Sequence, residues 1–197
     1  PSFFLGHGMA KPPVPSIDLV ERPDVITPET EAKVIGEEKN EWYRGSVTVN
    51  FTAFDWESGV ESTYYSLNGS AQQQGATINI TEDGKHVLEY WSVDKAGNIE
   101  PKKSIAINID QTAPEITFSV ADGAVYGVDQ QIRFTCEASD PLSGVASSTC
   151  EEISVPAYEL GLGSHTFKAE ATDHAGNSSS NSVTIIVTVN YDSLGSL

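Results

Sequence analysis

The chain has 197 residues, with 28 Asp and Glu against 11 Lys and Arg, so its formal net charge at pH 7 is −17. Nucleic acids and anionic membrane surfaces are excluded as partners, because both are held by Lys and Arg, and no stretch approaches the roughly 20 apolar residues of a membrane span. Divalent cations and water are the natural partners of so many carboxylates.

The first part of the chain differs in amino-acid composition from the rest. Residues 1–14 hold the only Met, a Gly-His-Gly and a Pro-Pro pair. Because Pro-rich segments act as stiff spacers, we expect a linker or the tail of a preceding domain here, in a longer or processed protein. Residues 21–41 are longer than an ordinary connection, and we expect an extra strand or a surface excursion in them.

The first strong strand signal lies at residues 47–53, where apolar and polar side chains alternate. A period of two with one apolar face indicates a half-buried β-strand. β-Branched residues at 105–109 predict another strand, and Asn-Gly and Asp-Gly pairs between the two segments are typical of turns.

The second half of the chain repeats these signals. Residues 132–138 alternate as residues 47–53 do, and residues 183–187 are again β-branched. No window shows the sustained 3.6-residue period of a helix. Short strands at this spacing, in units of about 80–95 residues, indicate an all-β fold built from antiparallel β-sandwiches.

Three motifs recur in the same order in both halves. They are Asp-x-x-Ser-Gly-Val at 55–60 and 140–145, Gly-x-His at 84–86 and 163–165, and Asp-x-Ala-Gly-Asn at 94–98 and 173–177. In both copies the His precedes the Asp of the last motif by eight positions. We therefore expect two domains of one fold, at residues 15–110 and 112–190, with a C-terminal tail at 191–197.

This set of motifs resembles the bacterial immunoglobulin-like repeats of secreted and surface proteins. The first copy, with Tyr64-Tyr-Ser-Leu-Asn-Gly69 and Tyr90-Trp-Ser-Val-Asp-Lys-Ala-Gly-Asn-Ile-Glu100, resembles the OmpL47-type repeat. The second copy resembles the immunoglobulin-like repeats of secreted hydrolases and adhesins. The resemblance implies two tandem immunoglobulin-like sandwiches in an extracellular protein, secreted or attached to the cell surface.

Such repeats serve as spacers, adhesin stalks and enzyme appendages, and fold alone does not choose among these roles. The chain has no Gly-x-Ser-x-Gly, His-Glu-x-x-His or P-loop motif. We therefore expect a non-catalytic module, a rigid spacer or an interaction module that contacts a surface protein. The alternative is a polysaccharide-binding appendage of a secreted hydrolytic enzyme.

The only two cysteines, Cys136 and Cys150, lie in the second copy with 13 residues between them. We expect them to form a disulfide, and related repeats often carry Cys at both places. A metal pair or a reactive thiol is the alternative, but no His clusters with them in the sequence. A disulfide implies an oxidising, extracellular setting.

Four aspartates end strands at matched turns, and two interpretations stand for them. They are Asp55, Asp94, Asp140 and Asp173. A turn Asp can accept hydrogen bonds from neighbouring backbone N–H groups and need no ion. The other interpretation is a calcium site, since Ca²⁺ takes six to eight oxygen ligands.

The junction between the copies reads Asp110-Gln-Thr-Ala-Pro114 and leaves few residues between the two domains. It resembles the linker of adhesin immunoglobulin-like repeats, in which calcium stiffens the joint. That resemblance implies that Asp110 is a calcium ligand. Alternatively, Pro114 alone restricts the linker.

Three tryptophans are the candidates for ligand binding, namely Trp42, Trp56 and Trp91. Trp91 follows Tyr90 on a predicted strand, so we expect its side chain to point outward while Tyr90 points into the core. Exposed flat rings can stack on sugar faces or on a partner protein. The alternative role of Trp91 is to cover the sheet or to meet the neighbouring domain.

Overall fold

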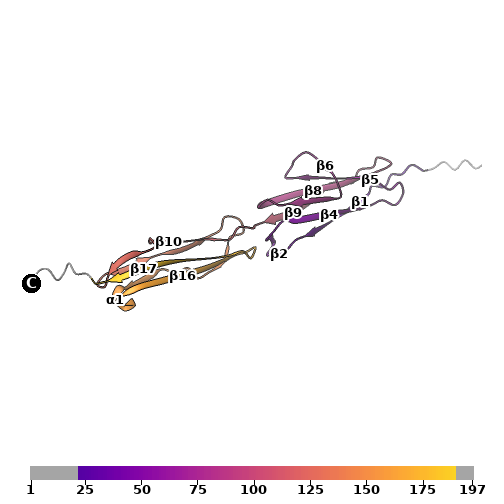
Figure 1. The fold of residues 1–197 in the computed structure, drawn as a ribbon. Coiled ribbons are helices and arrows are strands. Elements are labelled where there is room, and N and C mark those ends of the chain that lie inside the picture. The colour runs from indigo at the N-terminus through magenta and orange to yellow at the C-terminus, as the bar shows by residue number, and fades with distance from the viewer. Residues whose placement is uncertain (1–21, 190–197) are drawn as a thin grey trace, which may run out of the picture.

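The computed structural model describes residues 22–189, which form an elongated pair of β-sandwiches placed end to end (Figure 1). The N-terminal domain contains nine strands: β1 (Glu29–Ile35), β2 (Glu38–Lys39), β3 (Trp42–Tyr43), β4 (Val47–Phe54), β5 (Val60–Leu67), β6 (Gln73–Gln74), β7 (Thr77–Ile80), β8 (Gly84–Asp94) and β9 (Lys103–Ile109). The expected strand in residues 21–41 is β1, which pairs with β4. The expectations for residues 1–14 and 191–197 lie outside the described residues.

The C-terminal domain contains eight strands and one short helix: β10 (Glu115–Phe118), β11 (Ala124–Gly127), β12 (Gln131–Phe134), β13 (Cys136–Ser139), β14 (Val145–Ser148), β15 (Ile153–Pro156), α1 (Ala157–Leu160), β16 (Gly163–Asp173) and β17 (Ser178–Thr188). The helix is a single turn, too short to give a helical period in the sequence. None of the described residues belongs to a helix with the length and apolar character needed to cross a membrane.

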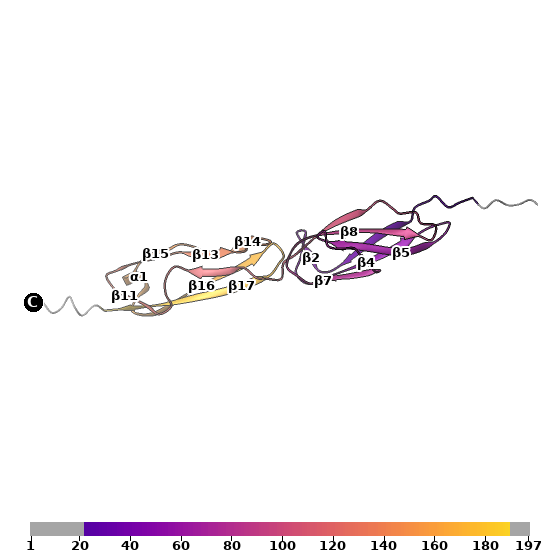
Figure 2. The same ribbon diagram turned by 90° about the horizontal axis from the view of Figure 1, so that it is seen from above.

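Each domain is a two-layer sandwich, as the alternating strands predicted. In the first domain a β1-β4-β7 sheet faces a β2-β3-β9-β8-β5-β6 sheet. In the second, a β11-β17-β16-β14 sheet faces the pairs β10-β13 and β12-β15 (Figure 2). Most pairings are antiparallel, and the exceptions among the described strands are β3-β9 and β11-β17, which run parallel.

The alternation at residues 47–53 places its apolar members in the first core. Val47 and Val49 on β4 are fully buried against Leu88, Ile107 and Ile109 from the facing sheet. In the second domain Ile132 and Phe134 meet the β-branched residues of β17. Apolar side chains buried on this scale are the main stabilising contribution in each sandwich.

The strand expected at residues 132–138 is divided in two, because the chain changes partner at Thr135. β12 pairs with β15, whereas β13 pairs with β10. At the break, Thr135 N–H donates to Ser119 Oγ at 2.8 Å, and Ser119 N–H donates to the Thr135 carbonyl at 2.9 Å. An alternating pattern marks the buried face and does not record which strand lies beside it.

Cys136 on β13 and Cys150 after β14 are joined by a disulfide, as the sequence predicted. The two Cα atoms are 4.9 Å apart, and both side chains pack against a small core of Ile116, Ala169 and Ala171. The bridge lies near one edge of the second sandwich and closes a loop of modest length. Such a crosslink stabilises mainly by restricting the unfolded chain.

Replacement of both cysteines by serine should lower the unfolding free energy of the second domain by roughly 3 kcal/mol, the chain-entropy value for a loop of this length. All three tryptophans lie in the first domain. Urea unfolding followed by circular dichroism reports both domains, while tryptophan fluorescence reports the first alone. An unchanged transition of the second domain would show that the bridge is not stabilising.

A buried polar network joins the two sheets of the first domain. Thr30 Oγ1 on β1 and Ser92 Oγ on β8 are 2.7 Å apart. The Glu100 carboxylate accepts the backbone N–H of Thr30 and that of Ser92, each at 3.0 Å, and Lys103 Nζ lies 3.6 Å from it. Thr30, Ser92 and Glu100 are all buried, so each polar group depends on the others for its hydrogen bonds.

Glu100→Ala should therefore lower the unfolding free energy of the first domain by roughly 2–4 kcal/mol, because it leaves the buried backbone N–H groups of Thr30 and Ser92 without their acceptor. It also removes the ion pair of Lys103, whose Nζ keeps the Thr30 carbonyl as an acceptor at 2.7 Å. Glu61→Ala, at an exposed position of β5, is the matched control and should change stability little. Urea unfolding monitored by tryptophan fluorescence makes the comparison. Equal effects of the two substitutions would contradict the role assigned to the network.

Candidate metal centres at the domain ends

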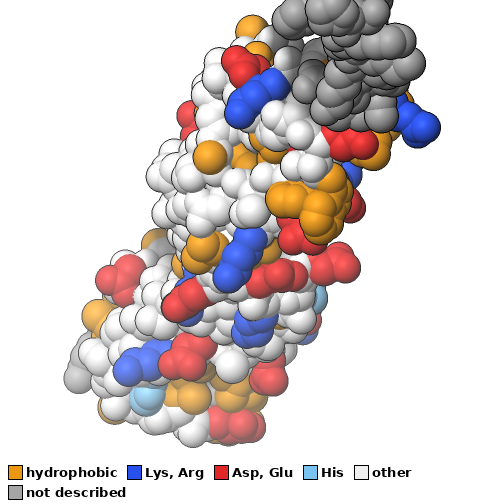
Figure 3. All heavy atoms as spheres, turned by 90° about the vertical axis from the view of Figure 1, so that its right-hand side faces the viewer, with side chains coloured by type: hydrophobic (Ala, Val, Ile, Leu, Met, Phe, Trp, Pro, Cys, Tyr) orange, Lys and Arg blue, Asp and Glu red, His pale blue; other side chains and the backbone are white. Residues whose placement is uncertain are grey.

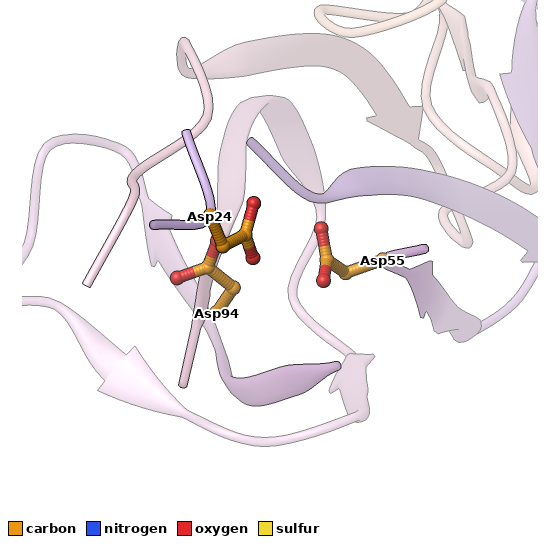
Figure 4. A group of neighbouring side chains, drawn as sticks. All are labelled: Asp24, Asp55 and Asp94. Carbon is orange, nitrogen blue, oxygen red and sulfur yellow. The ribbon is translucent and has the colours of Figure 1, made fainter. Parts of the chain in front are cut away.

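Two groups of three aspartates gather at equivalent ends of the two domains. Asp24, Asp55 and Asp94 form the distal triad, and Asp110, Asp140 and Asp173 form the junction triad. In each triad one carboxylate oxygen from every residue lies within 4.8 Å of the others. Figure 4 shows the distal triad, in which Asp24 and Asp94 lie side by side and Asp55 faces them.

Each triad takes one residue from the segment that enters the domain and two from strand ends. Asp55 and Asp140 follow β4 and β13, and Asp94 and Asp173 are the last residues of β8 and β16. Asp24 precedes β1, whereas Asp110 lies in the linker between β9 and β10. The structure thus brings together all five aspartates that the sequence marked, in two groups, and adds Asp24.

Sequence reasoning missed Asp24, although a signal for it exists. Asp24-Val-Ile-Thr-Pro28 has the same Asp-x-x-x-Pro spacing as Asp110-Gln-Thr-Ala-Pro114. With the first domain expected to begin near residue 15, this segment lay inside the expected domain, whereas the structure places it just before the first strand. The shared Pro ends the entering segment just before the first strand in both domains.

Backbone hydrogen bonds orient the carboxylates in the same way in both triads. Gly59 N–H donates to Asp55 Oδ1 at 2.7 Å, and Gly144 N–H donates to Asp140 Oδ1 at 2.7 Å. These glycines have φ near +80°, a conformation that other residues rarely adopt. The Ser-Gly pair of the motif therefore folds the backbone around the aspartate that begins it, as an Asx-type turn does.

The Asp-x-Ala-Gly-Asn motif supports the third carboxylate. Asn98 donates to Asp94 through its backbone N–H and its side-chain amide, each at 2.7 Å, and Asn177 donates to Asp173 in the same two ways at 2.8 Å. The same amides reach the carbonyl oxygens of Asp24 and Asp110, at 3.2 and 2.8 Å. One Asn thus ties the entering segment to the strand end in each domain.

The serine of the first motif completes the scaffold. Ser58 N–H donates to Asp24 Oδ2 at 3.1 Å, and Ser143 N–H donates to Asp110 Oδ2 at 3.0 Å. The prediction that turn aspartates accept backbone N–H bonds is confirmed. Each carboxylate oxygen has more than one lone pair, so these bonds leave acceptor capacity for a cation.

One carboxylate oxygen in each triad has no hydrogen-bond partner among the described residues. Asp55 Oδ2 and Asp140 Oδ2 are buried and have no hydrogen-bond partner among residues 22–189. The Asp55 residue is only 9 % exposed, and its carboxylate faces the other two (Figure 4). A buried carboxylate oxygen without a partner is costly. The same oxygen lacks a partner in both domains, and a cation is the kind of ligand that these carboxylates could hold.

Hydrogen bonding and desolvation at the distal triad shift the pKa of two carboxyl groups. Hydrogen bonds from Ser58 and from the Ile26 backbone hold the pKa of Asp24 below its usual value. Desolvation, followed by hydrogen bonding and charge repulsion from Asp24 and repulsion from Asp55, raises the pKa of Glu57. Glu57 is an additional carboxylate beside this triad, and the matched position of the second domain holds Leu142.

The joint between the domains is held by direct contacts as well. Asp110 N–H donates to the Tyr43 carbonyl of β3 at 2.9 Å, and Asn40 Nδ2 donates to the His174 carbonyl at 3.0 Å. Asp83 accepts bonds from Gln111 N–H at 3.0 Å and from Thr112 Oγ1 at 2.9 Å. The linker is therefore bonded along its length to one domain or the other.

The structure corrects the expectation of an exposed ring at Trp91 and Trp42, but not at Trp56. Trp91 is only 7 % exposed, because its ring stacks on Tyr64 with centroids 5.9 Å apart and Lys102 Nζ lies 4.4 Å above it. Trp42 is also buried. Trp56 is 82 % exposed and meets Phe54 edge to face at 4.5 Å. Of the three candidates for ligand binding, only Trp56 offers an open ring.

Several solved structures match the chain at low sequence identity and low TM-score. Fibronectin(III)-like modules of Clostridium thermocellum CbhA are 14 % identical, with 81 % of this chain and 95 % of that chain covered and a TM-score of 0.38. The D00-D0 domain of intimin is 9 % identical, with 79 % and 100 % covered and a TM-score of 0.40. A tetra-tandem repeat from the extending region of a large adhesion protein is 16 % identical, with 81 % and 50 % covered and a TM-score of 0.28.

No protein family model matches the chain, and no curated protein matches it in sequence. The finer resemblance of the first copy to the OmpL47-type repeat therefore stays a prediction. The expected fold class is confirmed, since the described residues form two all-β sandwiches.

The Asp83 contact gives a testable prediction for the linker. Asp83→Ala removes the acceptor of Gln111 and Thr112 and should broaden the distribution of domain orientations seen by small-angle scattering. Glu82→Ala is the matched control, because the structure uses only the backbone carbonyl of Glu82. A scattering profile identical to that of the native chain would show that Asp83 does not restrain the joint.

The pKa of Asp83 sets the pH range of this contact. Burial acts to raise it, but bonds from Gln111 and Thr112 outweigh burial and lower the pKa overall. The contact should therefore persist at neutral pH and be lost only as the pH falls below about 4, the ordinary value for Asp. A native chain whose joint loosens well above that pH would contradict this assignment.

Proposed function

We propose that the chain is a non-catalytic spacer module of an extracellular bacterial protein, made rigid by one Ca²⁺ bound at each aspartate triad. The observation that carries the proposal is the repeated, unpartnered oxygen of Asp55 and Asp140 within matched sets of three carboxylates. A cation bound at each triad would contact this oxygen, for which the protein provides no hydrogen-bond donor.

Calcium fits the donor set better than the other common cations. The triads offer only oxygen donors, which excludes the softer metals that prefer sulfur and nitrogen. Three carboxylates can supply up to six oxygens, and Ca²⁺ accepts six to eight with flexible geometry, whereas Mg²⁺ requires a strict octahedron. Extracellular calcium modules bind in the range of about 10⁻⁴–10⁻³ M, which suits a site formed by surface turns.

The junction triad connects ion binding to rigidity. Asp110 lies in the linker and is bonded to the first domain through the Tyr43 carbonyl, whereas Asp140 and Asp173 belong to the second domain. A cation shared by these three carboxylates would therefore fix the linker that follows β9 to the second domain, and with it the orientation of one domain relative to the other. Without it, three carboxylates in close proximity repel one another, so the apo joint is expected to be looser.

The cysteine pair supports the extracellular setting. A disulfide such as Cys136–Cys150 persists in oxidising compartments, and those compartments are also where calcium is abundant. Of the three tryptophans proposed to bind polysaccharide, Trp42 and Trp91 are buried and only Trp56 is exposed. The spacer function therefore has the stronger support.

Addition of 5 mM Ca²⁺ should stabilise each domain by about 2 kcal/mol if the dissociation constant is on the order of 10⁻⁴ M. That corresponds to a rise in melting temperature on the order of 10 °C for domains of this size. Asp140→Asn should remove the response of the second domain, and Asp55→Asn that of the first. Circular dichroism follows both domains, and tryptophan fluorescence follows the first domain alone. Mg²⁺ at the same concentration should have a smaller effect.

Asp129→Asn is the control for nonspecific charge neutralisation, because Asp129 is exposed and outside both triads. It should respond to Ca²⁺ as the native chain does. Absence of any calcium shift in the native chain, or an undiminished shift in both triad variants, would contradict the proposal.

A further inference from the structure

A fourth carboxylate lies beside the distal triad and has no counterpart at the junction. Glu57 stands two residues after Asp55, whereas Leu142 stands two residues after Asp140. The backbone is arranged alike in the two loops, since Glu57 N–H donates to Asp55 Oδ1 at 3.3 Å and Leu142 N–H donates to Asp140 Oδ1 at 3.1 Å. The two loops therefore differ at this position in the side chain and not in the course of the chain.

The Glu57 side chain lies against the triad. The carboxyl groups of Glu57 and Asp24 are within hydrogen-bonding reach of each other, and both residues line a shallow surface depression with Ser58 and Arg22. Ser58 N–H donates to Asp24 Oδ2 at 3.1 Å and to Asp55 Oδ1 at 3.0 Å. The loop that carries Glu57 is thus fixed against two of the three triad carboxylates.

A second observation at the distal triad points to a cation. Asp55 Oδ2 is buried without a hydrogen-bond partner among the described residues, in a side chain that faces Asp24 and Asp94 (Figure 4). The carboxylates of Asp24 and Glu57 also repel each other when both are ionised. A divalent cation at the triad would give the Asp55 oxygen a partner and offset that repulsion at the same time.

We propose that Glu57 is a fourth acidic residue of the distal calcium site and gives that site a higher affinity for Ca²⁺ than its three aspartates provide alone. The inference rests on the proposed function, because it requires that the triad binds calcium. The affinity of calcium sites depends on how many charged ligands they hold. A unit charge roughly 6 Å from a divalent cation changes its affinity by about tenfold even at the dielectric constant of water.

Other charges near the two triads differ as well, so the contribution of Glu57 has to be measured within one site. Lys95 follows Asp94 in the first domain, whereas His174 follows Asp173 in the second. Acidic and basic side chains are interspersed on the face of the molecule that Figure 3 shows. Comparison of one site with and without Glu57 keeps all these neighbours constant.

Isothermal titration calorimetry of the full chain with Ca²⁺, in backgrounds that keep one site, tests the inference. Asp140→Asn leaves the distal site, and in this background Glu57→Leu copies the second domain. It should raise the dissociation constant of the distal site about tenfold at low ionic strength, where charges are screened least. Glu61→Leu removes an exposed carboxylate of β5 and is the matched control, with little change expected.

The reverse substitution makes the same test at the junction. Asp55→Asn leaves the junction site, and in this background Leu142→Glu should lower its dissociation constant roughly tenfold, because it places a carboxylate where Glu57 stands in the first domain. Glu57 is exposed and Leu142 is partly buried. Melting temperatures without calcium therefore establish that each variant is folded before it is titrated.

The outcomes separate this inference from the proposed function. Calcium binding that Glu57→Leu leaves unchanged, or that Glu61→Leu weakens equally, would overturn the inference and leave the calcium sites standing. A folded Leu142→Glu chain whose junction site binds no more tightly would also overturn it. Absence of calcium binding in both single-site backgrounds would overturn the proposed function and this inference with it.

Discussion

The buried carboxylate of Asp110 is the constraint on which the arrangement of the two domains depends. It lies between the last strand of one sandwich and the first strand of the next, and it is fully buried at the end of the second domain. A charged group in that place must be compensated by hydrogen bonds or by a cation. The backbone N–H groups of Thr112 and Ser143 donate to this carboxylate at 3.1 and 3.0 Å, and a cation shared with Asp140 and Asp173 would compensate the remaining charge.

The same construction at Asp24 shows that the triad belongs to the fold and is not confined to the joint. Each domain folds two loops and its entering segment around three carboxylates, with the same donors and the same oxygen left over. In the second domain this end is joined to the first domain, through Asp110 N–H on the Tyr43 carbonyl and Asn40 Nδ2 on the His174 carbonyl.

Much of this could be predicted from the sequence, because repeated motifs report repeated structure. The alternation at residues 47–53 and the matched Asp, Gly and His positions indicated two sandwiches and four of the six triad residues, and the resemblance of the junction to adhesin linkers implied the fifth, Asp110. The burial of Trp91 could not be predicted, since alternation shows that Tyr90 and Trp91 face opposite sides but not that Tyr64 and Lys102 cover the second side. The division of residues 132–138 at Thr135 depended on a distant partner, Ser119. Asp24 was missed because its segment resembles the junction in only two positions.

Isothermal titration calorimetry with Ca²⁺ tests the central claim most directly, because it counts ions. The account predicts two ions bound by the native chain, one by Asp140→Asn and one by Asp55→Asn, with Asp129→Asn unchanged at two. Absence of binding to the native chain, or a stoichiometry that neither triad substitution alters, would contradict it.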